Sequence, residues 1–323
     1  MPELPEVEFH ARELRLWLDG RRIERAVAEK TRMLRGKTSP ASFAQTLSQS
    51  AVIEVERRAK VLLFHLDNDH TLVSHLGMSG KWIRLASEDP TPRASHAQLY
   101  LSDASVLHNV DSRMFGMLQV VAKDKLAKLK ELRNLGPDPL RDRFDGSVLQ
   151  TALGSSRAAI KGLLLNPRII SGIGNIHATE ALFHARIHPS RPAASLSPDE
   201  LEALARELAA TVKRGLAEHE KHGAVVYLSD HTDMPNPFVA YGRTGEPCPT
   251  CRSNFTHLII GGRTSTFCPT CQPLDSIAKR ANQRKGQGAG PLRGSRGAEP
   301  LVGSGAKPRS DKPRKTPMKK PSR

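Results

Sequence analysis

The chain opens with a pattern that predicts one amphipathic helix over residues 5–19. Apolar residues recur at helical spacing and fall on one face of that helix, and Gly20 supplies a stop signal. The apolar positions of this face are Val7, Ala11, Leu14 and Leu18.

The pattern changes to strands over residues 24–121. Short apolar runs such as 61–66, 71–74 and 98–101 are separated by turn signals. One helix in front of many short strands predicts a β-sandwich or barrel behind that helix.

Helical spacing returns after residues 135–139, a Gly- and Pro-containing stretch that we interpret as a linker. We expect helices over residues 157–165 and 175–186. A further helix begins at Ser197, because Ser197 and Glu200 form a capping box with a proline at the first helical position. Apolar residues then follow at helical spacing, namely Leu201, Leu204, Ala205, Leu208 and Val212.

These elements predict an α+β protein. We expect an N-terminal β-sandwich domain with a leading helix over residues 1–135 and a helical domain over 140–245. A small four-cysteine module over 246–272 follows the helical domain. Residues 273–323 are rich in Gly, Pro, Ser, Lys and Arg, a composition typical of a disordered tail.

The net charge of +16 and the pI of about 10.0 indicate a polyanionic partner, with nucleic acid ahead of an anionic membrane surface. Residues 273–323 hold 14 Lys and Arg against 3 Asp and Glu, so most of the excess lies in the tail. The acidic N-terminus lacks the apolar run of a secretory signal, and no stretch of about 18 apolar residues occurs. We therefore expect a cytoplasmic protein without a membrane partner.

Four cysteines form the most specific motif, two Cys-x2-Cys pairs with 16 residues between them: Cys248, Cys251, Cys268 and Cys271. Each pair presents two thiolates to one tetrahedral zinc, and the gap suits a hairpin. A site of four thiolates leaves no open position, so the zinc is expected to be structural. Arg263 follows two glycines at the hairpin tip and is either a groove-binding residue or a solvated charge.

Pro2 follows a methionine that is normally removed before a small residue, which leaves a free secondary amine. An α-amino group has a pKa near 7.7–8.0 in peptides, so it is partly unprotonated at neutral pH. Such an amine attacks a sugar C1′ to give a cationic iminium, and the neighbouring Glu3 offers a general acid or base. Taken alone, Pro2 is more often just the start of a helix.

Three further segments have both a functional and a structural interpretation. Glycines at 172 and 174 precede a predicted helix and let backbone N–H groups approach a phosphate, with Asn175 either capping that helix or binding the phosphate. Segments 75–80 and 111–116 place Met78, Arg113 and Phe115 beside glycines on turns, where they either enter a base stack or belong to the core. Lys60, close to arginines, is usually a solvated charge.

The order of these motifs resembles the formamidopyrimidine-DNA glycosylase family of base-excision enzymes. The resemblance runs from Pro2 to about Cys271 and favours this branch over that of endonuclease VIII. Its carriers, in family order, are segments 2–8, 57–60, 75–80 and 172–175 and the four cysteines. It implies a helix–two-turn–helix architecture for the second domain, and DNA lying between the two domains.

The resemblance also implies roles for individual residues. Pro2 is expected to be the nucleophile, Glu3 the acid/base group near the sugar, and Lys60 a DNA contact that assists elimination. Arg263 is grouped with these catalytic residues and is expected to hold a phosphate.

A second group is expected to bind DNA. Three of its members fill the gap left by the flipped nucleotide, one belongs to the same acidic site as Glu3, and the others hold phosphates around the bend. Met78, Arg113 and Phe115 are expected to fill the gap, with Arg113 facing the orphan base. Glu6 is expected to belong to the acidic site, and the phosphates are expected to be held by His75, Lys161 and Asn175.

The chain departs from the family pattern at several positions. His177 stands where tyrosine is usual, and Ser112 and Met114 replace the usual Pro and Arg around Arg113. Segment 223–241 is several residues shorter than the family's lesion-covering loop, with Ala224 and Val225 in place of the usual Thr-Thr. This shortening bears on lesion preference and leaves the chemistry untouched.

The sequence therefore predicts a monomeric DNA glycosylase and AP lyase with one structural zinc and no organic cofactor. Its partner is expected to be duplex DNA that contains oxidised purines or abasic sites. Two alternatives are the same chemistry on oxidised pyrimidines and a non-catalytic damaged-DNA-binding protein.

Overall fold

The computed structural model describes residues 2–225 and 236–274, which lie in one compact unit, Met1–Ala281. The predicted tail falls almost entirely outside the described residues, as does the middle of the shortened segment 223–241.

Helix α1 (Leu4–Leu18) follows the predicted N-terminal pattern, and Glu6 takes part in capping its start. The backbone N–H of Glu3 donates to Glu6 Oε2 at 2.7 Å, which is one half of a capping box. The helix contacts strands β2, β3 and β5 as well as helix α6, so its first two turns are buried on several sides. This burial explains why polar residues of α1 such as Glu8 and His10 are withdrawn from solvent.

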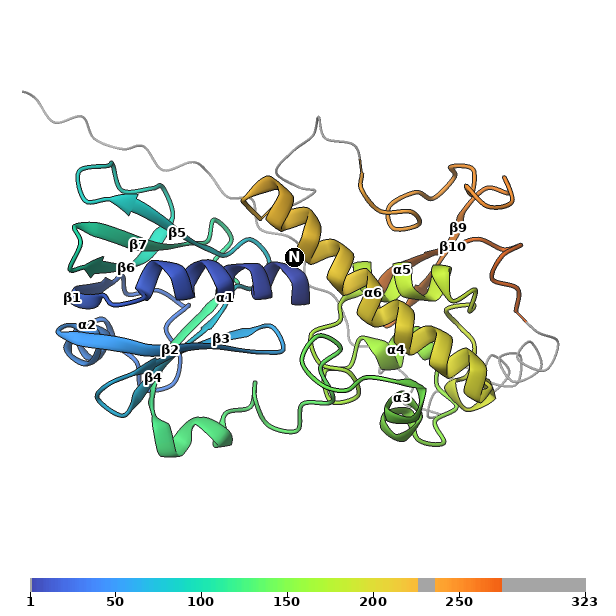
Figure 1. The fold of residues 1–323 in the computed structure, drawn as a ribbon, viewed down its shortest axis with the longest axis horizontal. Coiled ribbons are helices and arrows are strands. Elements are labelled where there is room, and N and C mark those ends of the chain that lie inside the picture. Colours follow the sequence, from blue (N-terminus) through green and yellow to red (C-terminus); the bar gives the residue numbers. More distant parts are fainter. Residues whose placement is uncertain (1, 226–235, 275–323) are drawn as a thin grey trace, which may run out of the picture. The chain divides into compact units, whose positions relative to one another are not determined.

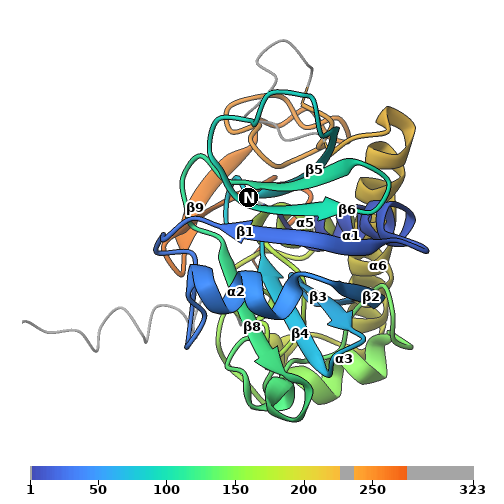
Figure 2. The ribbon, with the colours of Figure 1, turned by 90° about the vertical axis from the view of Figure 1, so that its left-hand side faces the viewer.

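Eight antiparallel strands follow in the order β5-β7-β6-β1-β2-β3-β4-β8. Only two residue pairs join β1 to β2, whereas the other neighbours share longer ladders. The sheet therefore folds into two layers at this junction (Figures 1 and 2). The strands are β1 (Arg22–Ala28), β2 (Ser50–Arg58), β3 (Val61–Leu66), β4 (His70–His75), β5 (Lys81–Ala86), β6 (Ser95–Leu101), β7 (Ser105–Val110) and β8 (Met117–Ala122).

One hydrophobic core lies between the two layers, which confirms the predicted β-sandwich. Phe64 of β3 packs against Trp82 of β5 with ring centroids 5.3 Å apart, and the Trp82 indole donates to Ser74 Oγ at 3.1 Å. Helix α2 (Pro40–Leu47), which the strand pattern does not predict, adds Phe43 and Leu47 to this core.

The second half of the unit is helical, with α3 (Gly146–Leu153), α4 (Ile160–Leu164), α5 (Asn175–His184) and α6 (Pro198–His222). Two short 3₁₀ turns, η1 (Lys123–Lys128) and η2 (Ala193–Ser195), complete the helical elements. Helix α6 begins with the predicted capping box at Ser197 and Glu200.

The helix predicted over residues 157–165 is wrong at its start, because Ala159 pairs with Pro192 and α4 begins only at Ile160. Helix α5 ends two residues before the predicted 186, since Arg186 takes a left-handed φ of 57°.

The predicted linker at 135–139 is firmly attached to the sandwich. Asp138 accepts a hydrogen bond from Arg57 Nη1 at 2.6 Å, and Arg57 Nε donates to Glu8 of α1 at 2.6 Å. All three side chains are buried, so the guanidinium ties α1, β2 and the linker together.

The cysteine module forms a hairpin of β9 (Thr256–Ile260) and β10 (Arg263–Phe267), as its spacing predicts. Gly261 and Gly262 make the turn with φ of 57° and 73°, a conformation that glycine adopts without strain. Across residues 2–225 and 236–274, no helix has the combined length and apolar character needed to cross a membrane.

Candidate active site and DNA-binding surface

The Glu3 carboxylate caps the N-terminus of α5, although Glu3 and α5 are far apart in the chain. Oε2 accepts hydrogen bonds from Gly174 N at 3.1 Å and His177 N at 3.2 Å, and Oε1 accepts one from Ile176 N at 2.9 Å. The sequence suggests that these backbone groups bind a phosphate. In the structure a carboxylate of the same chain occupies them instead.

Two glycines make room for this docking of the N-terminal segment. A Cβ on Gly174 would overlap the Glu3 carboxyl group, and one on Gly172, whose φ is 81°, would lie 2.5 Å from Leu4 Cδ1. The backbone N–H of Leu4 also donates to the carbonyl of Gly172 at 3.1 Å. The glycines are therefore required for close approach of α1, which their place before a helix alone does not reveal.

Asn175 is the first residue of α5 and lies beside this carboxylate. Its side chain does not cap the helix, because Gly174 holds the cap position without a side-chain hydrogen bond. Asn175 Oδ1 is buried without a hydrogen-bond partner among the described residues. An acceptor in that situation is available to a donor brought by a ligand or by water.

His177 makes the fourth hydrogen bond to Glu3, with Nδ1 2.9 Å from Oε2. Burial raises the pKa of Glu3, but the His177 hydrogen bond, the charges of His177 and Lys60 and the Ile176 N–H outweigh it and bring the pKa to about 2. Glu3 is therefore a carboxylate, and since a carboxylate only accepts, Nδ1 of His177 is the donor.

Glu6 lies in the same buried acidic cluster. Its Oε2 accepts the Glu3 backbone N–H, and its Oε1 is 3.2 Å from His219 Nε2 on α6. Burial raises the pKa of Glu6, yet the His219 hydrogen bond and the charges of His177 and His219 lower it overall. Glu6 thus joins α1 to α6, and within the described residues its contacts are those of a structural anion.

Lys60 lies in the tight turn between β2 and β3, next to Ala59, whose φ is 52°. Burial lowers the pKa of Lys60; the charges of Glu3 and Glu6 oppose this effect, and the charge of Arg263 reinforces it. The acidic cluster and the tip of the zinc hairpin therefore both act on the charge of Lys60. A lowered pKa makes a lysine easier to deprotonate, which a general base requires.

Lys161 is fully buried, with 0% of its surface exposed, which its expected phosphate contact does not anticipate. Its Nζ donates to Thr179 Oγ1 at 2.7 Å and to the carbonyl of Thr264 at 3.2 Å. Burial lowers the pKa of Lys161 to about 7, with Glu3 opposing and Arg263 adding to the shift. In this structure the side chain links α4, α5 and β10.

Arg263 is exposed at the start of β10, as expected for a residue that reaches a ligand. His75, at the end of β4, accepts the Gly77 N–H at Nδ1 with a distance of 2.9 Å. Burial and the charge of Lys60 lower the pKa of His75, so the ring is neutral with its proton on Nε2. That N–H is a donor suited to a phosphate oxygen.

Met78 and Phe115 project from two neighbouring loops and are not core residues. Their exposed fractions are 38% and 50%. A Cβ on Gly77 would overlap the backbone of Phe115 and Gly116, so the two loops are in direct contact. The surface therefore carries two adjacent apolar side chains on closely packed turns.

Buried Asp111 holds these loops together. It accepts hydrogen bonds from Ser79 Oγ at 2.6 Å and from the backbone N–H groups of Arg113 and Gly116 at 3.2 and 2.8 Å. The exposed Arg113 lies 5.0 Å from the Phe115 ring centroid. The Asp111 carboxylate therefore holds in place the two turns from which Met78, Arg113 and Phe115 project.

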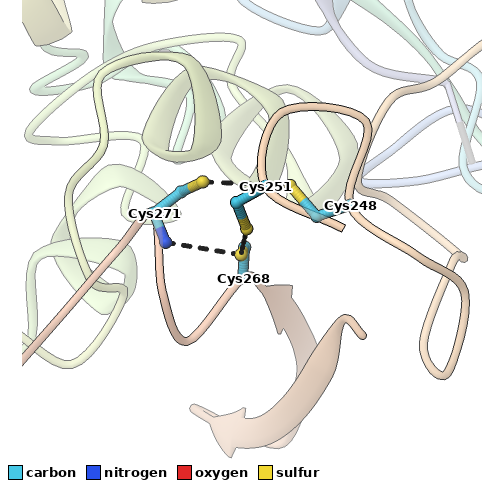
Figure 3. A group of neighbouring side chains, drawn as sticks. All are labelled: Cys248, Cys251, Cys268 and Cys271. Atoms are coloured by element: carbon cyan, nitrogen blue, oxygen red, sulfur yellow. Dashed lines mark hydrogen bonds between the residues drawn. The ribbon is translucent and has the colours of Figure 1, made fainter. Parts of the chain in front are cut away.

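Four sulfur atoms of the zinc ribbon converge (Figure 3). All four Sγ atoms lie within 4.8 Å of one another; Cys248 and Cys271 are 3.9 Å apart, and Cys251 and Cys268 are 3.4 Å apart. Zn–S bonds of about 2.3 Å in a tetrahedron place sulfurs about 3.8 Å apart, so the donor set fits one zinc. The ribbon attaches to the helical domain through Gln272, whose Nε2 donates to the Ile187 carbonyl at 2.8 Å.

Sequence reasoning missed three residues that shape these sites. His177 contacts Glu3, Asp111 anchors the two loops, and Arg32 donates to the carbonyls of Arg113 and Met114 at 2.7 and 3.1 Å. Asp111 is the first residue of the segment 111–116, and the turn signal of that segment could have revealed its role. His177 and Arg32 carry no local signal of their roles, because their partners are remote in the chain.

Three family models match the chain in succession. They are the formamidopyrimidine-DNA glycosylase N-terminal domain at residues 1–118, the H2TH domain of the same enzyme at 135–225, and the zinc finger found in FPG and IleRS at 245–274. The matches follow the sandwich, the helical domain and the ribbon.

Relatives and solved structures agree with these matches. The formamidopyrimidine-DNA glycosylase of Pelotomaculum thermopropionicum is 37% identical over 81% of this chain and 95% of that protein, and that of Symbiobacterium thermophilum is 38% identical over 85% and 90%. A structure of MutM with DNA containing carbocyclic 8-oxo-G has a TM-score of 0.74 at 30% identity, over 84% of this chain and 100% of that one. A Lactococcus lactis FPG complex with FAPY-dG-containing DNA gives the same TM-score, identity and coverage. This chain belongs to the formamidopyrimidine-DNA glycosylase family.

Proposed function

We propose that this protein removes oxidised purines, formamidopyrimidines and 8-oxoguanine, from duplex DNA and then cuts the strand at the resulting abasic site. The observation that carries the proposal is the fixed, ionised Glu3 carboxylate directly next to Pro2 in the chain. Relatives bearing this enzyme's name, and a solved relative bound to FAPY-dG-containing DNA, support the substrate class. A cytoplasmic location beside the chromosome follows from this proposal.

Pro2 is the proposed nucleophile once Met1 has been removed. Its nitrogen lone pair forms a bond to C1′ while the glycosidic bond breaks, and the bonding pair leaves with the base, which takes a proton from solvent. The nitrogen then passes its own proton to O4′ through Glu3 as a transient carrier. Its lone pair breaks the C1′–O4′ bond, and the product is an iminium.

The contribution of Glu3 is mainly electrostatic. The four hydrogen bonds that keep it ionised also make it a weak base, since they stabilise the carboxylate over the acid. A fixed negative charge beside a nitrogen that becomes cationic lowers the barrier without any rearrangement of the site. Lys60, with its lowered pKa, is the proposed acceptor of the C2′ proton, after which the 3′-phosphate leaves. Loss of the C4′ proton and departure of the 5′-phosphate complete the δ-elimination.

The exposed loop residues provide a route to the target base. Met78 and Phe115 are proposed to enter the stack where the damaged nucleotide leaves it, and Arg113 is proposed to face the orphan base. The neutral His75, Arg263 and the unpartnered Oδ1 side of Asn175 are proposed to line the path of the backbone, with water joining Asn175 to phosphate.

Oxidised pyrimidines are the second candidate substrate. A Lactococcus lactis FPG structure with 30% identity and a TM-score of 0.74 holds DNA containing an oxidised pyrimidine, so this fold accepts such lesions.

Borohydride trapping on matched duplexes distinguishes these proposals. Full-length protein is incubated with duplexes carrying FAPY-dG, 8-oxoguanine, an oxidised pyrimidine, an abasic site or no damage. We expect covalent adducts on the abasic duplex and the oxidised purines, with the fastest single-turnover excision on purines. Faster excision of the pyrimidine would support the second candidate, and tight binding without any adduct would support a non-catalytic binding protein.

A further inference from the structure

His177 is one of the positions at which this chain departs from the usual family residue, and it lies within hydrogen-bond distance of the proposed active-site carboxylate. The imidazole is 1% exposed, and Nδ1 donates to Glu3 Oε2 at 2.9 Å. The backbone N–H of the same residue donates to the same oxygen at 3.2 Å. One residue therefore supplies two of the four hydrogen bonds to Glu3.

The ring is held in place from its other side. A Cβ on Gly215 of α6 would lie 2.9 Å from His177 Nε2, so the imidazole packs closely against the helix backbone at that glycine. The Phe238 ring lies 6.3 Å away, centroid to centroid, in an edge-on arrangement. Nε2 has no hydrogen-bond partner within the described part of the chain. The imidazole's hydrogen bonding is therefore directed at Glu3 alone.

The charges around the ring favour its protonated form beside an ionised Glu3. Burial lowers the pKa of His177, but the hydrogen bond and charge of Glu3 and the charge of Glu6 raise it overall, with Lys60 opposing them. The groups with the largest effects are Glu3 at the N-cap of α1, Glu6 within α1 and Lys60 in the β2–β3 turn. His219 of α6 acts on Glu6.

We propose that His177 is a positioning residue that keeps the Glu3 carboxylate ionised and correctly oriented beside Pro2. Its catalytic consequence rests on the function proposed above: without the Nδ1–H donor, the negative charge next to the reacting nitrogen is partly lost to protonation and rotation. The role concerns the chemical step, because the side-chain hydrogen bond of His177 goes to Glu3.

Two substitutions separate hydrogen bonding from packing. His177→Asn retains an N–H donor near the position of Nδ1 but is much smaller, whereas His177→Leu retains most of the volume and lacks the donor. We expect single-turnover excision at pH 7 to fall about 10- to 100-fold in His177→Leu and only a few-fold in His177→Asn, with DNA affinity within about threefold in both. His184→Asn, an exposed histidine on the same helix, is the matched control and should match the wild type.

The pH profile provides a readout that a packing role would not change. The ratio of the wild-type rate to the His177→Leu rate should grow as pH falls from 7 to 5. In His177→Leu the effect of burial, which raises the pKa of Glu3, is no longer opposed by His177, so the Glu3 carboxyl becomes protonated. Using a ratio removes the pH effects that are common to both proteins. A His177→Leu protein that is as fast as His177→Asn, or a ratio that stays flat with pH, would overturn the proposal.

A measurement on the free protein tests the same idea without enzymatic activity. The ¹³C signal of the Glu3 carboxyl, assigned by its absence in Glu3→Gln, reports the Glu3 pKa directly. We expect that pKa to be higher in His177→Leu than in the wild type, and an unchanged value would refute the role of His177. Wild-type protein that forms no borohydride adduct would instead reject the proposed function, while this titration still decides the role of His177.

Discussion

The zinc ribbon and the acidic site show two different ways of building a functional centre. The ribbon's four cysteines lie within 24 consecutive residues, and their spacing alone predicts a closed metal site. The acidic site joins Glu3 to Gly174, Ile176 and His177, and Glu6 to His219. Only the docking of α1 between the sandwich, α5 and α6 brings them together. A local site can be interpreted from a motif, whereas a distributed site requires the fold.

The two centres also differ in what holds their charges. In the ribbon, zinc is expected to neutralise the thiolates. In the acidic site no metal is needed, because histidines and helix N–H groups stabilise the carboxylates of Glu3 and Glu6. Loss of one group should therefore have a different outcome in each centre: unfolding of the hairpin in the first, and a change of protonation in the second.

The largest expected effect is at Pro2. Pro2→Gly, which replaces the secondary amine by a primary one, or retention of Met1, which moves the free amine one residue away, should strongly reduce borohydride trapping while DNA affinity stays within about threefold, because the binding surface is intact. Gel analysis of trapped adducts on an abasic duplex measures this directly. Undiminished trapping by both variants would place the nucleophile elsewhere.

Removal of a zinc ligand should be the next largest effect. Cys268→Ser is expected to lose the metal and to weaken DNA binding by at least about tenfold, because the hairpin that carries Arg263 is no longer held. Most of the helical circular dichroism should remain, since α3 to α6 lie outside the ribbon. Elemental analysis for zinc is the check, with His257→Ala, at an exposed position of β9, as the control inside the same module. A full complement of zinc in Cys268→Ser would contradict the four-thiolate site.

The acidic site should reveal itself in the pH dependence of stability. The pKa of Glu3 is lowered from 4.5 to about 2, so its contribution is present above pH 4.5 and is lost as pH falls toward 2. The raised pKa of His177 means that the contribution of this pair is complete below pH 6.5 and declines as pH rises through the folded value.

Comparison of the wild type with Glu3→Gln isolates this contribution. Chemical denaturation should show the largest difference in the free energy of unfolding, about 3 kcal/mol at most, between pH 4.5 and 6.5. A difference that does not depend on pH would mean that packing, and not ionisation, dominates at Glu3.

The smallest expected effect concerns the basic tail, which contributes no residue to the four-cysteine site or to the acidic site. Deleting residues 274–323 removes a net charge of about +11 and should make the salt dependence of binding shallower, by about 0.9 in log–log slope for each phosphate that the tail neutralises. Single-turnover cleavage of a saturated lesion duplex should stay nearly unchanged, because every proposed catalytic residue precedes Cys271. Equal salt slopes with and without the tail would indicate a segment that does not bind DNA, and an absence of single-turnover cleavage would mean that the active part of the chain extends beyond Cys271.

The sequence by itself determined the elements whose signals are local. The apolar face of α1, the capping box at Ser197, the short apolar runs of the strands and the cysteine spacing each depend on residues close together in the chain. Their main features are found in the structure. Helices α2 and α3 were not predicted from the sequence, because each has only eight residues, too few for a clear periodic pattern.

The tertiary structure alone decided which groups share the acidic site. The backbone N–H groups before α5 suit any anion, and a glycine pattern does not distinguish a phosphate from the chain's own Glu3. Lys161 likewise resembles a phosphate ligand in sequence but is buried against Thr179. In both cases the partner lies on another element, so its identity is fixed by long-range packing, which local residue patterns do not encode.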